Sequence, residues 1–220
     1  MTELNCIEIE TNDTVDAAVI WLHGLGASGE DFVPIVPELR LPNSVGVRFI
    51  FPNAPEIPVT VNGGYIMPAW YDILSMDIDR QIDEKQLLAS ANAVSAIIDR
   101  EISRGINSNR IIIAGFSQGG AVGYQVALTC PHTLGGLIGM STYFATADVI
   151  KTHRANAKLP IHLYHGTADP VVPELLGQKA KTQLESMGYA PAYSTYPMDH
   201  SVCLEEIEDI ARFLCHQLSL

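Results

Sequence analysis

The sequence predicts an α/β fold, with a mostly parallel central sheet and helices on both of its faces. Short apolar, β-branched segments alternate with longer amphipathic segments along the chain, as expected for repeated strand–helix units. Several of the short segments are apolar on both faces, which is typical of strands in a covered parallel sheet. The chain of 220 residues is long enough for one large core and short for two, so we expect a single domain spanning 1–220.

The expected elements follow from these two patterns. We expect strands at 6–9, 17–22, 47–51, 110–115, 136–140, 160–164 and 192–196. We expect helices at 29–39, 82–104, 118–128, 172–187 and 202–218. Gly188 directly follows the fourth of these helices, where glycine commonly ends a helix.

Segment 52–78 breaks the alternation, with four prolines, two adjacent glycines and many large apolar side chains. Long irregular stretches in compact domains are usually functional. This one follows the strand ending at Phe51, so it should emerge at the carboxyl edge of the sheet, where open α/β sheets bind ligands. We therefore predict a substrate-covering segment whose acyl-binding side chains are Met67, Trp70, Ile73 and Leu74. For Trp70 the alternative is ordinary core packing.

Exposure within this segment can also be predicted. Ile73, Leu74 and Met76 lie among the acidic residues Asp72, Asp77 and Asp79. We therefore expect this apolar stretch to be partly exposed beside the site.

Composition excludes several classes of protein. The formal net charge is −12 and no cluster of Lys or Arg occurs, which argues against nucleic-acid binding and docking on anionic membranes. No apolar run approaches the ~20 residues of a membrane span, and the acidic N-terminus does not resemble a signal peptide. The four cysteines are scattered, so we expect neither a disulfide framework nor a zinc site, and a cytoplasmic location fits.

The segment Gly115-Phe116-Ser117-Gln118-Gly119 matches the G-x-S-x-G pattern of a nucleophile elbow. A β-branched strand precedes it and a helical pattern follows, which is the strand–turn–helix setting that this motif requires. We therefore predict an α/β-hydrolase fold with Ser117 as nucleophile. The alternative is a glycine-rich helix start with a capping serine. Cys203 lies near a candidate base, but no turn motif presents its sulfur.

A serine nucleophile needs a base and an acid that orients it. In this fold the chain order is Ser, then Asp or Glu, then His. Asp169 follows the strand at 160–164, and His200 follows the strand at 192–196, so both belong at the same sheet edge as Ser117. The competing residues fit less well: Asp199 neighbours the base in sequence, and His165 would reverse the expected order.

The first long strand ends in His23-Gly24-Leu25-Gly26, an HG-type loop. Such loops supply one N–H of an oxyanion hole, and the residue after the nucleophile, here Gln118, supplies the other.

Together these motifs resemble the carboxylesterase, lysophospholipase and acyl-protein thioesterase family of small α/β-hydrolases. The matching segments are LHGLGASGEDF at 22–32, FPNAP at 51–55, PVTVNGGYIMPAWYD at 58–72, GFSQGGAVGY at 115–124, HGTADPVVP at 165–173 and HSVCLEEI at 200–207. The resemblance implies a triad of Ser117, Asp169 and His200 and an oxyanion hole formed by the N–H groups of Leu25 and Gln118. We also place Val171 among the substrate-binding residues.

The expected activity is that of a serine carboxylesterase that forms an acyl-enzyme, because AWYD and HSVC look closest to bacterial carboxylesterases. The alternatives are an acyl-protein thioesterase or lysophospholipase acting on longer chains, and a non-catalytic binding protein of the same fold. We expect a small ester, thioester or lipid-like substrate, no metal or other cofactor, no nucleic acid and no integral membrane association. The sequence leaves room for a homodimer.

Overall fold

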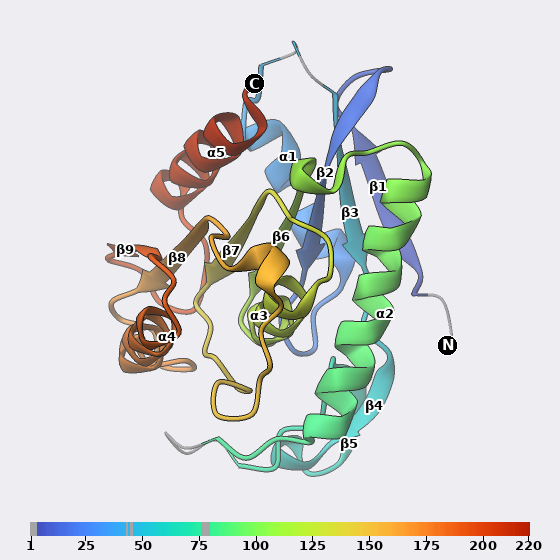
Figure 1. Cartoon of the computed structure of the whole chain (residues 1–220). Coiled ribbons are helices and arrows are strands. Elements are labelled where there is room, and N and C mark those ends of the chain that lie inside the picture. The colour runs from blue at the N-terminus through green and yellow to red at the C-terminus, as the bar shows by residue number, and fades with distance from the viewer. Residues whose placement is uncertain (1–3, 43, 45, 76–79) are drawn as a thin grey trace.

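A central sheet of mostly parallel strands organises the chain (Figure 1). This computed structural model describes residues 4–42, 44, 46–75 and 80–220. Within them the sheet has seven strands in the order β1-β3-β2-β6-β7-β8-β9. Only β1 is antiparallel to its neighbour. The predicted α/β fold with a mostly parallel sheet is therefore confirmed.

The strands of this sheet lie close to the predicted ranges. They are β1 Cys6–Glu10, β2 Val15–Leu22, β3 Gly46–Pro52, β6 Ile111–Phe116, β7 Gly136–Met140, β8 Ile161–Gly166 and β9 Ala192–Tyr196. The α-helices are α1 Ile35–Glu38, α2 Glu84–Ser103, α3 Gln118–Thr129, α4 Glu174–Ser186 and α5 Leu204–Leu218, and the 3-10 turns are η1 Gly29–Phe32, η2 Thr60–Asn62, η3 Ser108–Arg110 and η4 Arg154–Asn156.

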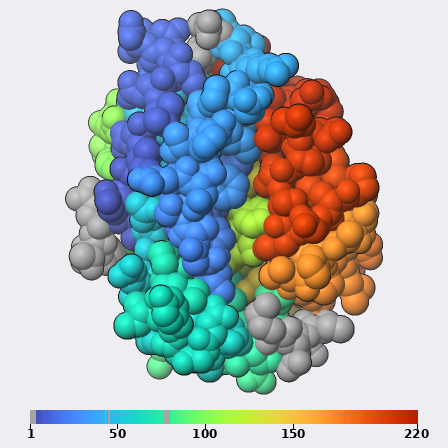
Figure 2. Space-filling view, turned by 180° about the vertical axis from the view of Figure 1, so that it is seen from behind, coloured from blue at the N-terminus to red at the C-terminus, as the bar shows by residue number. Residues whose placement is uncertain are grey.

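Two cores lie on opposite faces of the sheet, because side chains alternate along each strand. In β2, Ile20 and Leu22 belong to the core beneath α2, α3 and α4, whereas Val19 and Trp21 belong to the core beneath α1 and α5. Figure 2 views the molecule from behind and shows α5 in red beside the blue N-terminal segments. The two covered faces explain why central strands such as β6 and β7 are apolar on both sides.

Two sequence predictions were wrong in detail. The helix expected at 29–39 is divided into η1 and α1, because Pro34 and Pro37 cannot donate the backbone hydrogen bonds of a continuous helix. The segment expected to be irregular contains an antiparallel hairpin of β4 Glu56–Val59 and β5 Tyr65–Pro68. These strands were not predicted because Pro58 and Pro68 argue against a strand in sequence, although proline is tolerated in an edge strand.

Helix α5 begins after the loop that carries His200, and its first turn contains a buried acid. Glu206 is 0% exposed, and this burial raises the pKa of its carboxyl from 4.5 to about 8. The folded protein therefore holds a proton that the unfolded chain loses at lower pH. Its free energy of unfolding should fall as pH rises from about 4.5 to about 8 and should level off above that range.

We expect Glu206→Gln to remove most of this decline, because the amide stays neutral at every pH. The free energy of unfolding of the wild type should fall by at most about 4 kcal/mol between these two pH values. Urea unfolding from pH 5 to pH 9 would measure it, with the exposed acid Glu208 changed to Gln as the control. If the free energies of unfolding of the wild type and Glu206→Gln differed by the same amount at every pH in this range, the raised pKa of Glu206 would be contradicted.

Candidate active site

Ser117 occupies a sharp turn between strand β6 and helix α3. Its backbone has φ 53° and ψ −118°, a sparsely populated conformation for a residue with a side chain, and one that persists only where neighbours enforce it. A Cβ on Gly115 would lie 2.5 Å from the carbonyl oxygen of Gly119. A Cβ on Gly119 would lie 2.5 Å from the carbonyl oxygens of Leu22 and His23. Both glycines of the motif are therefore required by close backbone packing.

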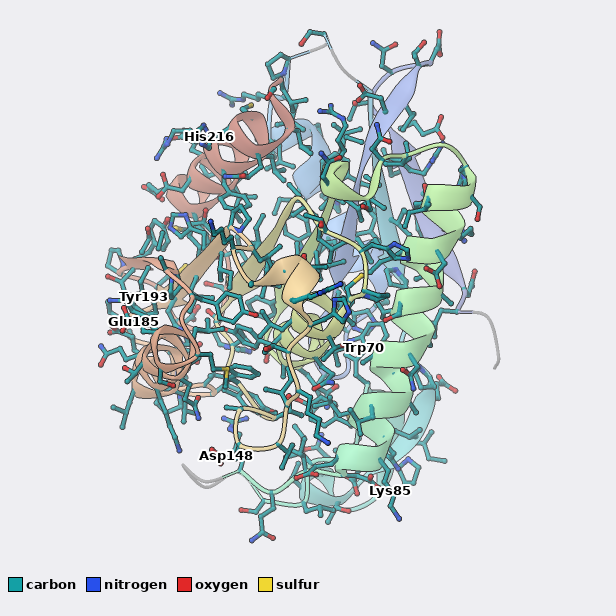
Figure 3. The ribbon with its side chains drawn as sticks, viewed as in Figure 1. Trp70, Lys85, Asp148, Glu185, Tyr193 and His216 are labelled. Carbon is teal, nitrogen blue, oxygen red and sulfur yellow. The ribbon has the colours of Figure 1, made fainter. Side chains whose placement is uncertain are left out.

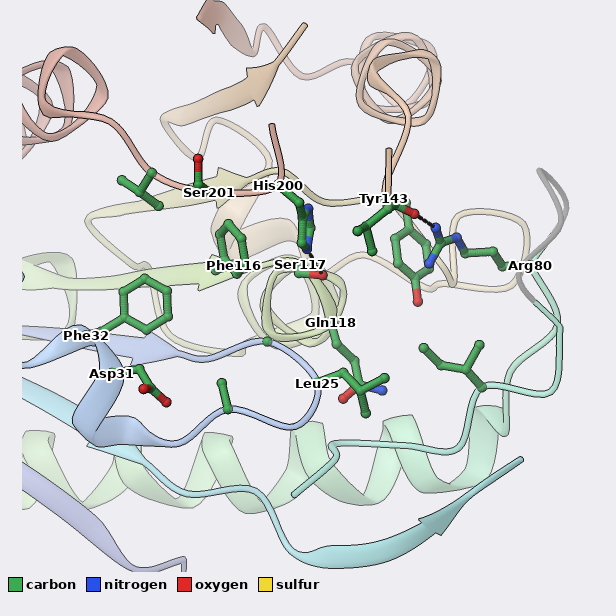
Figure 4. A pocket seen from close by; sticks show the side chains of 15 residues that line it. Leu25, Asp31, Phe32, Arg80, Phe116, Ser117, Gln118, Tyr143, His200 and Ser201 are labelled. Carbon is green, nitrogen blue, oxygen red and sulfur yellow. Dashed lines mark hydrogen bonds between the residues drawn. The ribbon is translucent and has the colours of Figure 1, made fainter. Parts of the chain in front are cut away.

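Three side chains form one hydrogen-bonded chain at the carboxyl edge of the sheet. Figure 4 shows two of them, Ser117 and His200. The His200 Nε2 atom lies 2.9 Å from the Ser117 Oγ atom. The His200 Nδ1 atom lies 2.6 Å from the Asp169 Oδ2 atom. The three residues proposed from the sequence therefore lie at one site, although they follow strands β6, β8 and β9, which are distant in the chain.

The surroundings of Asp169 orient its carboxylate toward His200. Its side chain is 0% exposed, and its Oδ1 atom accepts hydrogen bonds of 2.8 Å from both Val171 N–H and Val172 N–H. The Oδ2 atom thus faces His200. A carboxylate in this position favours the tautomer with a proton on Nδ1, which leaves Nε2 able to accept the serine proton.

The competing residues stand apart from Ser117. His165 is buried, and its Nε2 atom lies 2.8 Å from the carbonyl oxygen of Val172. Burial also lowers the pKa of His165, which favours the neutral ring. Its Nε2 atom is 3.8 Å from Asp169 Oδ2, so it packs behind the acid. Asp199 is exposed, as expected for a loop acid.

The two residues predicted to supply the oxyanion donors line the same pocket as Ser117. Gln118 begins α3, so its N–H is among those that a helix leaves without an internal acceptor. Leu25 lies in the loop after β2. A hydrogen bond of 2.8 Å from Gly26 N–H to the Pro68 carbonyl oxygen holds this loop in place. Within the described ranges, no hydrogen bond occupies the N–H of Leu25 or Gln118. Two such donors suit a developing oxyanion.

The side chain of Gln118 has a role that the sequence did not suggest. Its Oε1 atom accepts from Trp70 N–H at 2.9 Å, and its Nε2 atom donates to the Tyr71 carbonyl oxygen at 2.7 Å. The indole of Trp70 donates to the His23 carbonyl oxygen at 2.8 Å. The covering segment is thus fastened to both the elbow and the loop after β2.

A pocket of about 430 Å³ opens at Ser117. Its lining is Gly24, Leu25, Ala27, Asp31, Phe32, Ile73, Arg80, Phe116, Ser117, Gln118, Tyr143, Val171, His200, Ser201 and Val202. Ile73 and Val171, both predicted to bind substrate, are among these residues. Met67, Trp70 and Leu74 are absent from the lining.

These differences have physical causes. Trp70 is 1% exposed and lies inside the molecule beside α2 (Figure 3), where its hydrogen bond serves packing. Met67 belongs to β5, and its sulfur accepts from the Asn62 side chain at 3.2 Å. Ile73 is 3% exposed, contrary to the expected exposure, whereas Leu74 is 46% exposed as expected. Met76 lies outside the described residues.

Sequence reasoning missed several lining residues. Tyr143 and Arg80 come from loops that carry no motif, so only their spatial position reveals them. Phe32 ends the matching segment 22–32, but nothing in that segment indicates that its ring faces the pocket. Phe116 could have been found, because it directly precedes Ser117 in the G-x-S-x-G pattern. Its ring centroid lies 4.7 Å from that of His200.

Among the described residues, no group of three or more His, Cys, Asp or Glu side chains could hold a metal ion. In the same part of the chain, none of the helices has the length and apolar character needed to cross a bilayer.

Comparison with known proteins identifies the family. Residues 4–218 match the Phospholipase/Carboxylesterase family. The chain belongs to this family. It is 41% identical to acyl-protein thioesterase 1 of Neurospora crassa, over 92% of this chain and 87% of the relative. It is 38% identical to acyl-protein thioesterase 1 of Saccharomyces cerevisiae, over 91% of this chain and 92% of that protein.

Solved structures agree with the family assignment. SOBER1 of Arabidopsis thaliana is 34% identical and superposes with a TM-score of 0.87, covering 92% of this chain and 99% of its own. Acyl-protein thioesterase 2 of Zea mays is 27% identical with a TM-score of 0.86, covering 97% of this chain and 99% of its own. These findings support a hydrolase, and they favour the thioesterase alternative over the general carboxylesterase of the sequence analysis.

Proposed function

We propose that this protein is a serine hydrolase that cleaves acyl thioesters and related esters, with the activity type of its acyl-protein thioesterase relatives. The observation that carries the proposal is the Ser117–His200–Asp169 chain, with distances of 2.9 and 2.6 Å, at the opening of a largely apolar pocket. An acyl chain can enter this pocket while its carbonyl carbon lies against Ser117 Oγ.

The geometry supports a two-step reaction. His200 accepts the proton of Ser117 as its Oγ atom attacks the acyl carbon, and the oxyanion is stabilised by the N–H groups of Leu25 and Gln118. His200 then donates this proton to the departing thiol or alcohol, which leaves an acyl group on Ser117. Water, deprotonated by His200, attacks the acyl-enzyme. The bond between the acyl carbon and Ser117 Oγ then breaks, His200 returns the proton to Oγ, and the carboxylic acid is released.

The direct test uses a synthetic peptide carrying an S-octanoyl cysteine and the p-nitrophenyl ester of the same acid. We expect release of thiol from the first and nitrophenol from the second. A fluorophosphonate inhibitor should abolish both activities, with its adduct located on Ser117 by mass spectrometry. A folded, pure protein that hydrolyses neither substrate and forms no adduct would instead be a non-catalytic member of the fold.

The structure changes which residue best tests the acyl-binding wall. Val171 lines the pocket, whereas Leu74 is absent from the lining, although their exposed fractions are similar at 41% and 46%. Val171→Ala removes two methyl groups. Each carbon that a bound acyl chain would cover contributes ~0.8 kcal/mol, so kcat/KM for octanoyl relative to acetyl esters should fall up to roughly tenfold. Leu74→Ala should leave this ratio unchanged. The opposite ranking of the two variants would place the acyl chain against Leu74.

A further inference from the structure

One end of the pocket at Ser117 contains an acidic side chain. Figure 4 shows Asp31 and Phe32 on one side of Ser117, and Tyr143 and Arg80 on the other. Each of these residues lines the pocket. A substrate bound across Ser117 would thus place one of its two parts beside a carboxylate.

Asp31 also has a structural role, which does not account for its charge. Its Oδ2 atom accepts from Ser28 N–H at 2.6 Å and from Ser28 Oγ at 3.2 Å, and so caps the turn η1. Both bonds involve Oδ2, and a neutral asparagine oxygen could also accept them, although more weakly. The negative charge beside the pocket is therefore not needed for the cap.

Two aromatic rings lie on the same side of the pocket. Phe32 and Phe116 are both half-buried pocket residues, with ring centroids 5.8 Å apart and planes tilted by 51°. The faces of aromatic rings attract cations, and quaternary ammonium groups in particular are bound by aromatic side chains. The exposed carboxylate of Asp31 lines the same pocket as these two rings, and this combination has the chemistry that recognises an alkylammonium group.

The position of His200 indicates which part of the substrate would meet these residues. The leaving group must receive its proton from His200, so it departs beside that ring. The ring of Phe116 lies 4.7 Å from the ring of His200, centroid to centroid. Ser201, which follows His200 in sequence, lines the same side of the pocket in Figure 4.

We propose that Asp31, Phe32 and Phe116 form a subsite for a cationic leaving group, so that the enzyme prefers thioesters and esters whose thiol or alcohol carries an alkylammonium group. This specificity rests on the proposed hydrolase function. The uncharged acyl chain then occupies the other side of the pocket, where Arg80 bonds to the Val171 carbonyl oxygen and lies over the ring of Tyr143.

The test compares two thioesters that differ in one charge. Butyrylthiocholine carries a trimethylammonium group, and S-(3,3-dimethylbutyl) thiobutyrate replaces its nitrogen by carbon with the same shape. Both release a thiol, which a chromogenic disulfide reagent detects, and Ser117→Ala protein corrects for reaction of the reagent with the protein's own cysteines. The quantity measured is the ratio of kcat/KM for the cationic substrate to that for the neutral one.

We expect the wild-type ratio to exceed one. Asp31→Asn should lower it roughly threefold to tenfold in dilute buffer, and about 0.5 M salt should weaken the wild-type preference by screening. Asp31→Glu should retain most of the preference because it keeps the charge. Two controls should keep the wild-type ratio: Ser28→Ala, which removes the hydroxyl from the cap, and Glu30→Gln, which removes the neighbouring exposed charge outside the lining.

The outcomes separate this proposal from the proposed function. A wild-type ratio of one or less, or a ratio that Asp31→Asn does not change, overturns the cationic subsite while leaving the hydrolase intact. An equal fall with Ser28→Ala also overturns it, because the effect would then come from the cap. If the wild type hydrolyses neither thioester faster than Ser117→Ala, the proposed hydrolase function itself fails.

Discussion

Replacing Ser117 by alanine should lower kcat for ester and thioester hydrolysis by a factor on the order of 10⁶, which is the usual loss when a triad nucleophile is removed. The Oγ atom at 2.9 Å from His200 Nε2 is the atom that would bond to the acyl carbon, and alanine offers no substitute. The backbone of the turn should persist, because it depends on Gly115, Gly119 and the bond from Ser117 N–H to the Met140 carbonyl oxygen, 2.9 Å long.

The measurement compares kcat/KM for p-nitrophenyl butyrate in the wild type and Ser117→Ala, with melting temperature as the check on folding. Cys203→Ala is the informative control, because this half-buried thiol lies near His200 in sequence and is the alternative nucleophile. It should remain active. Loss of activity in Cys203→Ala, together with survival of activity in Ser117→Ala, would reverse the assignment.

Asp169→Asn should lower kcat by about 10⁴-fold with little change in the fold. The amide oxygen of asparagine would take the position of Oδ1, since only an acceptor satisfies the N–H groups of Val171 and Val172. Its NH₂ group would then face His200 Nδ1. Because an NH₂ group donates, Nδ1 would become the acceptor and Nε2 would carry the proton, in the wrong position to accept one from Ser117.

This loss can be measured with the same ester, and its control is Asp199→Asn. Asp199 is the exposed acid directly before His200, so it tests whether mere proximity in sequence matters. We expect Asp199→Asn to retain most activity. If it were as inactive as Asp169→Asn, the orientation of His200 would depend on the loop charge rather than on the buried carboxylate.

The sequence predicted those parts of the molecule that depend on backbone geometry. No residue with a Cβ fits in place of Gly115 or Gly119. The carboxyl ends of β8 and β9 could place Asp169 and His200 only at the sheet edge that carries Ser117. The mostly parallel sheet followed from strands that are apolar on both faces.

The wall of the pocket was less predictable, because large apolar side chains in an irregular segment give no indication of the direction in which they point. Trp70 and Ile73 are three residues apart and both are buried, yet only Ile73 lines the pocket. Their difference depends on the hydrogen bonds of Trp70 to Gln118 and His23. Such bonds join segments that are distant in sequence and leave no periodic pattern.

Gln118 couples catalytic rate to acyl selectivity, two properties that could otherwise vary independently. Its N–H lies at the start of α3 directly after Ser117, and its side chain holds the backbone of Trp70 and Tyr71. A substitution at this position would disturb rate and acyl selectivity together. Changes at Gln118 and in the segment it holds should therefore combine non-additively, so that either one alters which substitutions the other tolerates. New acyl preferences would then arise more readily at Val171, which is free of this link, than in the segment that Gln118 anchors.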